Sequence, residues 1–384
     1  MKLKELVEII GGGTPSRDNS IYWNGNIPWV TVKDINREYI DSSIEFITEE
    51  GLNNSSTNLI KKNSLLIPTR MGLGRVAINT VDVTINQDLK ALVPKNSDLL
   101  DLEYLYYFLK SKSDYLISQG KGATVKGITL DILRELDVPL LSLDIQKKIV
   151  KVLNIVYNLI QKRQSQITAL DELTQSLFFD MFGNPISNSK GWIIRTLKDF
   201  GEWKSGGTPL RSNKGYYNGD IPWLSSGELN DIYISESLEH INEKAIEESA
   251  TKYIEEGSIL LGMYDTAALK SSIVKMRCTC NQAIAFSKLD EQKVSTLYVY
   301  QYIQMAKEHL KRQQRGVRQK NMNLSMIKDL MVMYPPIELQ LEFEKKFQIL
   351  EEKKNLLSEG LKQLEILYNS LLQKTLKVDL FQEE

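Results

Sequence analysis

The stretch Gly12-Gly13-Thr14-Pro15 returns 194 residues later as Gly206-Gly207-Thr208-Pro209, and this repetition decides the fold. The same offset holds along most of each copy, as these pairs show: Tyr22 and Tyr216, Gly122 and Gly316, Lys126 and Lys320, Leu170 and Leu364, and Leu177 and Leu371. A constant offset over such a length predicts two whole domains. Two similar domains in one chain build a pseudo-two-fold molecule, which suits a target with two separated halves, and DNA is the commonest such target.

The composition is that of an ordinary globular protein. The chain has 384 residues, of which 42% are apolar and 25% charged, and this is enough for two or more domains with their own cores. The longest apolar runs are far shorter than a membrane span and no secretory signal opens the chain, so we expect a cytoplasmic protein with no membrane partner. The net charge of −1 argues against a histone-like DNA coat but allows DNA binding, because only one face needs to be basic.

Charge is segregated along the chain. Residues 311–320 hold five cations and no acid, whereas residues 228–256 hold nine acids against Lys244 and Lys252. A charge run is often only a solvated face. The region that aligns with 311–320 is also basic, however, and this favours a surface that contacts phosphate. Lys121 and Lys126 lie in this region, and Lys110 and Lys112 lie just before it.

Each copy opens with a part that mixes strand and turn patterns, residues 1–143 and 183–337. Prolines near the start of each copy exclude a central helix there. The predicted elements are strands at Ser64–Ile67, Arg75–Ile78 and Ser271–Met276, tight turns at Asn24-Gly25 and Asn218-Gly219, and helices at Leu102–Ser118 and Thr296–Gln313. We therefore expect two compact α+β globules, each with a strongly bent sheet.

Each globular part is followed by a long predicted helix, residues 144–182 and 338–379. Residues 144–180 contain no glycine or proline, and Gly183-Asn184-Pro185 then ends the first helix. Apolar residues alternate at spacings of four and three over four heptads, which is the pattern of a coiled-coil seam. The apolar seam positions are Ile149, Leu153, Val156, Ile160, Ile167, Leu170 and Leu177 in the first helix, and Phe343, Phe347, Leu350, Leu357, Leu361, Leu364 and Leu371 in the second.

The two seams are expected to pack against each other as an antiparallel coiled coil, because the repeat places them at equivalent positions. The globules would then sit at opposite ends of a helical spacer. The seams also contain Arg163 and Thr174 in the first helix, and Lys354 and Tyr368 in the second. Arg163 and Lys354 fall at different heights, where they either fix the register or extend their stems toward water.

Neither copy carries a pattern for catalysis or metal binding. Gly11-Gly12-Gly13 lacks the Gly-Lys-Ser/Thr ending of a phosphate-binding loop, and a proline soon after it breaks the context of a dinucleotide fingerprint. His240 and His309 are isolated, and Cys278 and Cys280 are interpreted as small strand residues rather than part of a zinc site. The sequence favours recognition over catalysis, with no metal or cofactor of its own.

The repeated segments resemble the specificity subunit of type I restriction-modification systems. The carriers are Gly-Gly-Thr-Pro-Ser-Arg at 12–17, Tyr-Trp-Asn-Gly at 22–25, Ile-Pro-Trp-Val-Thr-Val-Lys-Asp at 27–34, the Asn-Gln pairs at 86–87 and 281–282, and the Gly-x-x-x-Lys-x-x-x-Leu stretches from Gly122 and Gly316. The resemblance covers essentially the whole chain in the family's order of recognition domain, helix, recognition domain and helix. The chain departs from the family where each long helix starts, since Asp144-Ile145-Gln146 and Glu338-Leu339-Gln340 replace its usual Glu-Gln pair.

This resemblance implies two target-recognition domains without catalysis of their own. Such subunits bind a bipartite, asymmetric sequence in double-stranded DNA and recruit two modification subunits, which methylate adenine with S-adenosylmethionine. Restriction subunits add a motor and nuclease that use ATP and Mg. Two alternatives stay open, namely a targeting subunit of another methyltransferase–nuclease and a coiled-coil scaffold that bridges two protein partners.

Some candidate DNA contacts are shared by the two copies. The Gly-Gly-Thr-Pro loops are either turns whose glycines adopt positive φ, or loops whose N–H groups and threonine hydroxyls contact phosphate. Arg17 and Arg211 follow these loops and are expected to contact phosphate or guanine. Trp29 and Trp223 are interpreted as core anchors. Features that both copies share cannot by themselves encode two different half-sites.

Base readout is therefore expected from loops that differ, residues 68–75 and 262–270, unless these are only variable surface loops. Arg70 and Arg75 can fork onto guanine, whereas Tyr264, Asp265 and Lys270 offer a different set of donors and acceptors. The candidate DNA-binding residues are Thr14, Ser16, Arg17, Lys33, Arg70, Arg75, Lys121, Lys126, Thr208, Arg211, Tyr264, Lys270, Arg312, Arg315, Arg318 and Lys320.

Overall fold

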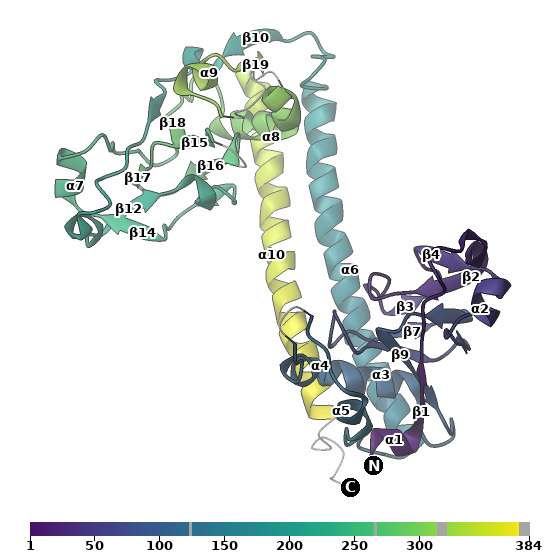
Figure 1. The fold of residues 1–384 in the computed structure, drawn as a ribbon. Helices are drawn as coiled ribbons and strands as arrows, with labels where there is room; N and C mark the ends of the chain where they lie inside the picture. The colour runs from purple at the N-terminus through teal and green to yellow at the C-terminus, as the bar shows by residue number, and fades with distance from the viewer. Residues whose placement is uncertain (123–124, 265–266, 313–320, 376–384) are drawn as a thin grey trace. The chain divides into compact units, whose positions relative to one another are not determined.

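The computed structural model describes residues 1–122, 125–264, 267–312 and 321–375 (Figure 1). The chain divides into two compact units: unit 1 holds residues 1–164 and the residues from Glu359 onward, and unit 2 holds Ser165–Ser358. The two long helices, α6 (Leu143–Phe182) and α10 (Ile337–Thr375), each contribute to both units. Each unit thus combines one strand-rich part with a segment of each long helix.

The strand-rich part of unit 1 contains two sheets. One has the order β1 (Val7–Gly11), β9 (Leu89–Pro94), β6 (Leu65–Pro68), β7 (Ala77–Asn79) and β3 (Tyr39–Ile40), and the other β4 (Glu45–Ile47), β2 (Trp23–Val30), β8 (Val83–Ile85) and β5 (Leu59–Ile60). The helices are α1 (Leu3–Leu6), α2 (Glu49–Asn53), α3 (Leu102–Ser111), α4 (Ser113–Ser118) and α5 (Leu130–Arg134), and η1 (Ser20–Tyr22) is a 3-10 turn. The expectation of one strongly bent sheet was wrong, because the strands divide between two sheets.

Alternation along β6 shows how unit 1 fills two cores at once. Leu65 and Ile67 pack in a cluster with α3 and the long helices, while Leu66, on the opposite face, packs between the sheets against Ile85. Successive strand side chains point to opposite faces, so a strand with cores on both sides is apolar throughout, as β6 is. The side chain of Asp101 accepts a hydrogen bond from the N–H of Tyr104 and caps α3.

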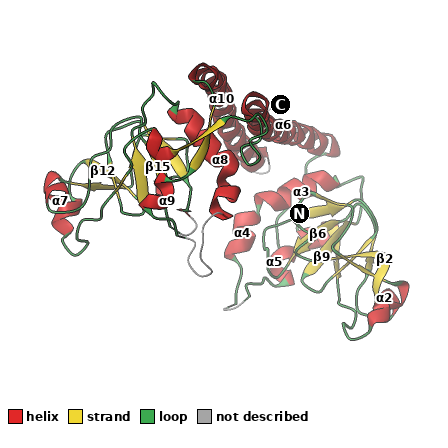
Figure 2. Cartoon of the chain, turned by 90° about the horizontal axis from the view of Figure 1, so that it is seen from above, coloured by secondary structure: helices red, strands yellow, loops and turns green. Residues whose placement is uncertain are grey.

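Unit 2 repeats this arrangement. Its sheets are β11 (Lys204–Ser205), β18 (Ile284–Ser287), β15 (Ile259–Gly262), β16 (Ser271–Val274) and β13 (Tyr233–Ile234); β14 (Glu239–Ile241), β12 (Ile221–Leu224) and β17 (Thr279–Cys280); and β10 (Ile193–Thr196) with β19 (Met331–Tyr334). The helices are α7 (Glu243–Glu247), α8 (Thr296–Arg312) and α9 (Leu324–Lys328), with 3-10 turns η2 (Leu197–Asp199), η3 (Lys214–Tyr217) and η4 (Ser226–Glu228). Figure 2 shows α8 between the sheet and α10.

The long helices pack antiparallel, which confirms the predicted coiled coil. In unit 1 the ring of Tyr157 lies 6.2 Å from that of Tyr368. In unit 2 Asp171 and Lys354 form an ion pair at 2.5 Å, so the partner number on α10 falls as the number on α6 rises. Every predicted seam position is buried or half-buried, Arg163 and Lys354 included. The helix ends also agree, since α6 stops at Phe182 and Gly183 adopts φ 79°.

The structure differs from the sequence prediction at three places. The helix predicted at Leu102–Ser118 is split into α3 and α4 at Lys112. Asn24, with φ 60°, lies in a bulge inside β2 rather than in a tight turn between strands, and Asn218 ends η3 with φ −115°. The glycines of the two Gly-Gly-Thr-Pro loops do not adopt positive φ. They are glycines because backbone passes close by: a Cβ on Gly12 would lie 2.2 Å from the Ile85 carbonyl oxygen.

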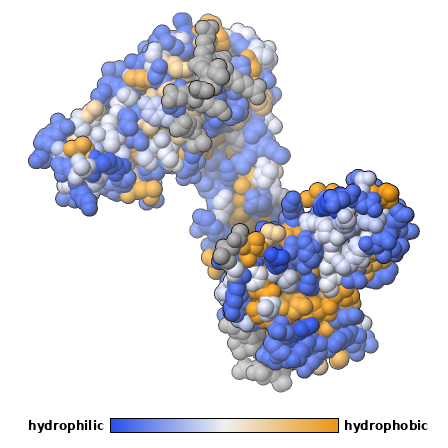
Figure 3. Space-filling view, viewed as in Figure 1, coloured by the Kyte–Doolittle hydropathy of each residue, from blue (hydrophilic) through white to orange (hydrophobic). Residues whose placement is uncertain are grey.

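Helix α8 and the two cysteines agree with the sequence predictions. Helix α8 matches the predicted start at Thr296. Cys278 and Cys280 are buried free thiols, Cys280 in β17 and Cys278 in a single bridge to Ile254, and burial raises the pKa of Cys278 to about 12. As a separate observation, no helix in the described ranges is long and apolar enough to span a membrane, and no group of three or more His, Cys, Asp or Glu side chains there could hold a metal ion. The face of unit 2 seen in Figure 3 is mostly hydrophilic.

Candidate nucleic-acid interface

The Gly-Gly-Thr-Pro loop of each unit is held by a glutamine from the turn between two strands, β8 and β9 in unit 1 and β17 and β18 in unit 2. The hydroxyl of Thr14 donates a hydrogen bond to Oε1 of Gln87, and that of Thr208 donates to Oε1 of Gln282. The same contact therefore recurs in both units. The oxygen of each glutamine amide accepts this bond. Its NH₂ group is therefore available to donate to an anionic or neutral acceptor, such as phosphate.

The arginine that follows each loop is paired inside the protein. Arg17 makes a bidentate ion pair with Glu45, with Nη2 at 3.0 Å from Oε2, and Arg211 pairs with Glu239 in the same way. The Arg17 guanidinium also lies 3.8 Å from the ring centre of Trp23. The hydrogen bond from Arg17 lowers the pKa of Glu45. About half of each arginine side chain is exposed, so N–H donors that do not face the glutamate remain accessible to solvent.

The tryptophans are core anchors, as predicted. Trp29 is 3% exposed and Trp223 is 1% exposed. Each indole Nε1–H donates a 3.0 Å hydrogen bond to a carbonyl of the Gly-Gly-Thr-Pro loop, that of Gly13 in unit 1 and that of Gly207 in unit 2. The indoles thus fix the loops from beneath and are not free to stack on bases.

The structure brings together two regions of unit 1 that are far apart in the sequence. The N–H of Ile128 donates to the carbonyl of Thr69 at 2.9 Å, and Arg70 forms a bridge with Gly127. The loop at 68–75 therefore lies beside the segment that carries Lys121 and Lys126, both exposed. Three of the predicted DNA-binding cations of this unit, Arg70 among them, are gathered in one place.

Two further predicted residues belong to the same group. Lys33 is exposed and follows Val32, which lies close to Gly72, since a Cβ on Gly72 would be 2.8 Å from the Val32 side chain. Nη1 of Arg75 reaches the carbonyl of Ile35 at 3.4 Å. Ser16 is exposed, and its carbonyl accepts a hydrogen bond from the indole of Trp23.

Arg70 is held by a carboxylate next to Gln87. Its Nη1 lies 3.7 Å from Oδ1 of Asp88, and the Asp88 carbonyl accepts from the N–H of Thr69. Asp88 is mostly buried while the Arg70 side chain is 57% exposed. A row therefore runs from Thr14 through Gln87 and Asp88 to Arg70 and the basic segment. We name these residues, with their unit 2 counterparts, the recognition row.

Unit 2 builds the same row from different side chains. The N–H of Met322 donates to the carbonyl of Met263 at 2.7 Å, the counterpart of the bond between Ile128 and Thr69. Tyr264 stands where unit 1 has Arg70, and Ala283 follows Gln282 as Asp88 follows Gln87. Lys270 donates a 2.8 Å hydrogen bond to Oδ1 of Asn230.

Some predicted residues cannot be placed. Asp265, Arg315, Arg318 and Lys320 lie outside the described residues, and Arg312 is described only as the last residue of α8. Sequence reasoning also missed Glu45, Glu239, Asp88 and the role of the two glutamines. The spacing of 28 residues between arginine and glutamate occurs in both copies, and this repeated spacing was the available signal.

The sequence matches a known family over most of its length. The family described as "Type I restriction modification DNA specificity domain" matches residues 1–169 and 189–366. The chain is 28% identical over 374 residues to the type I restriction enzyme MjaIX specificity subunit of Methanocaldococcus jannaschii, covering 92% of this chain and 86% of that protein. It is 36% identical over 159 residues to the EcoR124I/EcoR124II specificity subunit of Escherichia coli, which is 40% of this chain and 39% of the relative.

Solved structures share the fold. A specificity subunit from M. genitalium superposes with a TM-score of 0.59 at 16% identity, covering 98% of this chain and 95% of that one. A chain from a study of complex assembly and conformational transition of a type I system gives a TM-score of 0.65 at 15% identity, covering 99% and 97%. At such low identity these similarities establish the fold and not the residues that contact a ligand.

Proposed function

This chain belongs to the type I restriction-modification DNA specificity family, and we propose that it reads a bipartite, asymmetric DNA target, one half with each unit. It is the DNA specificity subunit of such a system and, in this proposal, has no catalysis and no cofactor of its own. The observation that supports the split target is the recognition row, which has one scaffold and two sets of side chains.

The shared part of the row would position the DNA. Thr14 with Gln87, and Thr208 with Gln282, offer the same amide donors in both units. Contacts to phosphate carry no sequence information and fix register, so identical residues serve two different half-sites equally well. Exposed lysines such as Lys121 and Lys126 would add the salt-dependent part of the affinity.

The part of the row that differs would read bases. Arg70, oriented by Asp88, presents a fork of donors that matches O6 and N7 of guanine. Tyr264, beside Ala283, has a hydroxyl and an aromatic ring in the same place and lacks a carboxylate neighbour from that turn. Two units with the same backbone and different readout residues would recognise two different sequences.

The long helices would hold the partner subunits. Outside the seam, Ile155 and its counterpart Ile349 are 51% and 65% exposed, and Leu173 and its counterpart Leu367 are 50% and 47% exposed. Exposed apolar residues at equivalent places in both copies suit two copies of one partner. We assign them to two modification subunits, which would bring S-adenosylmethionine, while restriction subunits would bring ATP and Mg.

Methylome sequencing tests this function. The chain would be expressed with its cognate modification subunit, and then as a chimera in which residues 1–143 come from a relative. The expected result is adenine methylation at a split motif, of which the chimera changes one half and keeps the other. A change in both halves would overturn independent readout. Absence of any methylation, together with no preference among duplexes in binding assays, would instead favour a protein scaffold.

A further inference from the structure

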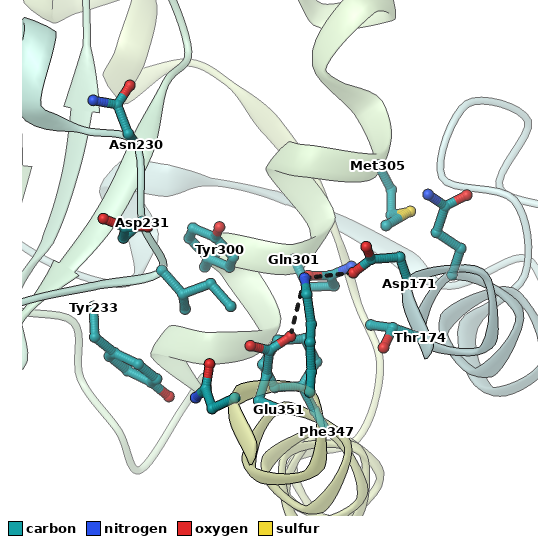
Figure 4. Close-up of a pocket in the computed structure, with 14 residues that line it drawn as sticks. Asp171, Thr174, Asn230, Asp231, Tyr233, Tyr300, Gln301, Met305, Phe347 and Glu351 are labelled. Atoms are coloured by element: carbon teal, nitrogen blue, oxygen red, sulfur yellow. Dashed lines mark hydrogen bonds and ion pairs between the residues drawn. The ribbon is translucent and has the colours of Figure 1, made fainter. Parts of the chain in front are cut away.

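Unit 2 contains a hollow between its strand-rich part and the long helices. The hollow has a volume of about 720 Å³, within the range of about 300–1,000 Å³ that is usual for ligand pockets. Figure 4 shows Asp231 just before β13, Tyr233 in β13, Tyr300 on α8 and Glu351 on α10 around this space. All of its lining residues belong to unit 2.

The equivalent place in unit 1 is filled by its own side chains. Tyr157 on α6 and Tyr368 on α10 meet there, and both lie near Tyr106 on α3. Nζ of Lys110 lies 5.1 to 5.4 Å from the ring centres of all three tyrosines. Unit 1 therefore holds a cation inside a cage of aromatic rings, an arrangement stabilised by attraction between the charge and the ring faces.

The offset of 194 shows what unit 2 has instead. Tyr300 is kept as the counterpart of Tyr106, but Glu351 stands for Tyr157 and Thr174 for Tyr368. Gln304 stands for Lys110, and its Nε2 donates a 2.5 Å hydrogen bond to Oγ of Ser271. Two large rings and the internal cation are thus absent from this position in unit 2, and a carboxylate takes the place of one ring.

The charges around the hollow are unequal. Three carboxylates line it, those of Asp171, Asp231 and Glu351, against the ammonium of Lys354. Lys354 pairs with Asp171 and lies 3.9 Å from Glu351, beyond hydrogen-bond distance. Burial raises the pKa of Glu351, so its charge is poorly solvated. Two further cations contact residues of the lining: Lys270 bonds Asn230, and Lys275 lies 4.3 Å from the centre of the Tyr233 ring.

We infer that this hollow receives the guanidinium group of an arginine side chain from a protein partner. Resting on the proposed function, the partner is a modification subunit bound at unit 2. A guanidinium is flat enough to stack on Tyr300 and offers paired donors to the carboxylates of Glu351 and Asp231, and arginine is favoured at the centres of protein interfaces. Unit 1, filled by Lys110 and its tyrosines, has no such site at the equivalent place.

Two variants of the full-length chain test the site. Thr174→Tyr with Glu351→Tyr gives unit 2 the residues that fill unit 1, and Glu351→Gln keeps the shape while removing the charge. Glu352→Gln, at the exposed neighbouring position, is the matched control. Removal of a charge-assisted hydrogen bond is expected to weaken binding of one of the two modification subunits at least tenfold by calorimetry, with DNA binding by the isolated chain unchanged.

The readouts separate this inference from the proposed function. If the filled variant binds both modification subunits like the wild type, the site does not exist. If the wild type binds no modification subunit, the proposed function fails in that respect, and titration with free arginine amide decides about the site. Saturable binding that is abolished in the filled variant but kept in Glu352→Gln supports it, and equal behaviour of all three proteins overturns it.

Discussion

Units 1 and 2 agree in the residues that hold the Gly-Gly-Thr-Pro loop and differ in the residues that follow it in the recognition row. The threonine–glutamine bond and the arginine–glutamate pair recur with the same atoms. Arg70 with Asp88, by contrast, corresponds to Tyr264 with Ala283. The side chains that hold the backbone of the loop are thus identical in the two units, whereas side chains without that structural role differ. Comparison of the two units therefore identifies candidate specificity residues more narrowly than exposure or charge alone.

The strongest test of the shared part concerns glycine. A Cβ on Gly12 would lie 2.2 Å from the Ile85 carbonyl oxygen, and one on Gly206 would lie 2.2 Å from that of Cys280. Because backbone cannot easily move away, Gly12→Ala and Gly206→Ala should each lower the free energy of unfolding by about 3 kcal/mol. Denaturant unfolding measures this. Gly11→Ala, which meets open space, is the control, and an equal effect there would refute the close-approach argument.

A second test concerns the part that differs. Arg70→Ala should relax the choice of base at one position in the half-site of unit 1, with a loss of discrimination of about 1–3 kcal/mol. Tyr264→Ala should affect only the other half. Competition binding with single-base variants of the target measures both. Arg37→Ala, which removes an exposed arginine paired with Asp41, is the control. If one substitution reduced base discrimination in both half-sites, the two units would not recognise their half-sites independently.

The basic segments provide a third test. Alanine at Lys121 and Lys126, or at Arg315 and Arg318, should weaken all duplexes alike. The slope of log K against log salt should become shallower by about 0.9 for each phosphate that the variant no longer neutralises. Titration at several salt concentrations measures this for both pairs, with Lys353→Ala on the exposed face of α10 as control. Unchanged slopes would mean that the segments are solvated faces.

The smallest expected effect concerns the arginine–glutamate pairs. Arg17 lowers the pKa of Glu45 below its ordinary 4.5, so the carboxylate stabilises the folded state above that pH and the gain disappears as pH falls through the lowered pKa. The wild type should exceed Glu45→Gln in unfolding free energy by less than about 1 kcal/mol at neutral pH, because the pair is largely exposed, and by nothing in strong acid. Thermal unfolding across pH measures this. Glu239→Gln should match it at neutral pH, and a clear mismatch would break the equivalence of the units.

The sequence predicted the features that depend on the spacing of apolar residues and on the offset of 194 residues between the two copies. The seam from Ile149 to Leu177 follows from spacings of four and three, and every position is covered in the structure. The contact between Thr14 and Gln87 did not follow, because 73 residues separate them and neither residue type signals a partner. Of the two interpretations of the loop, the one that gives its glycines positive φ was wrong, because a glycine serves equally for positive φ and for a close approach of backbone. The hollow beside Glu351 could not be predicted, because it forms where side chains from separate elements leave space unfilled, and no local sequence pattern indicates this.

The glycine of α10 has a mechanical consequence. Gly360 comes directly after Ser358 and Glu359, where the chain passes from unit 2 to unit 1, and a Cβ there would lie 2.6 Å from Nη1 of Arg163 on α6. Glycine costs a helix about 1 kcal/mol relative to alanine, so α10 resists bending less at this turn than in the turns on either side. Amide hydrogens around Gly360 should exchange with solvent sooner than those in the helical turns on either side. A helix to which both units contribute is therefore more easily bent at the turn where the chain passes from one unit to the other.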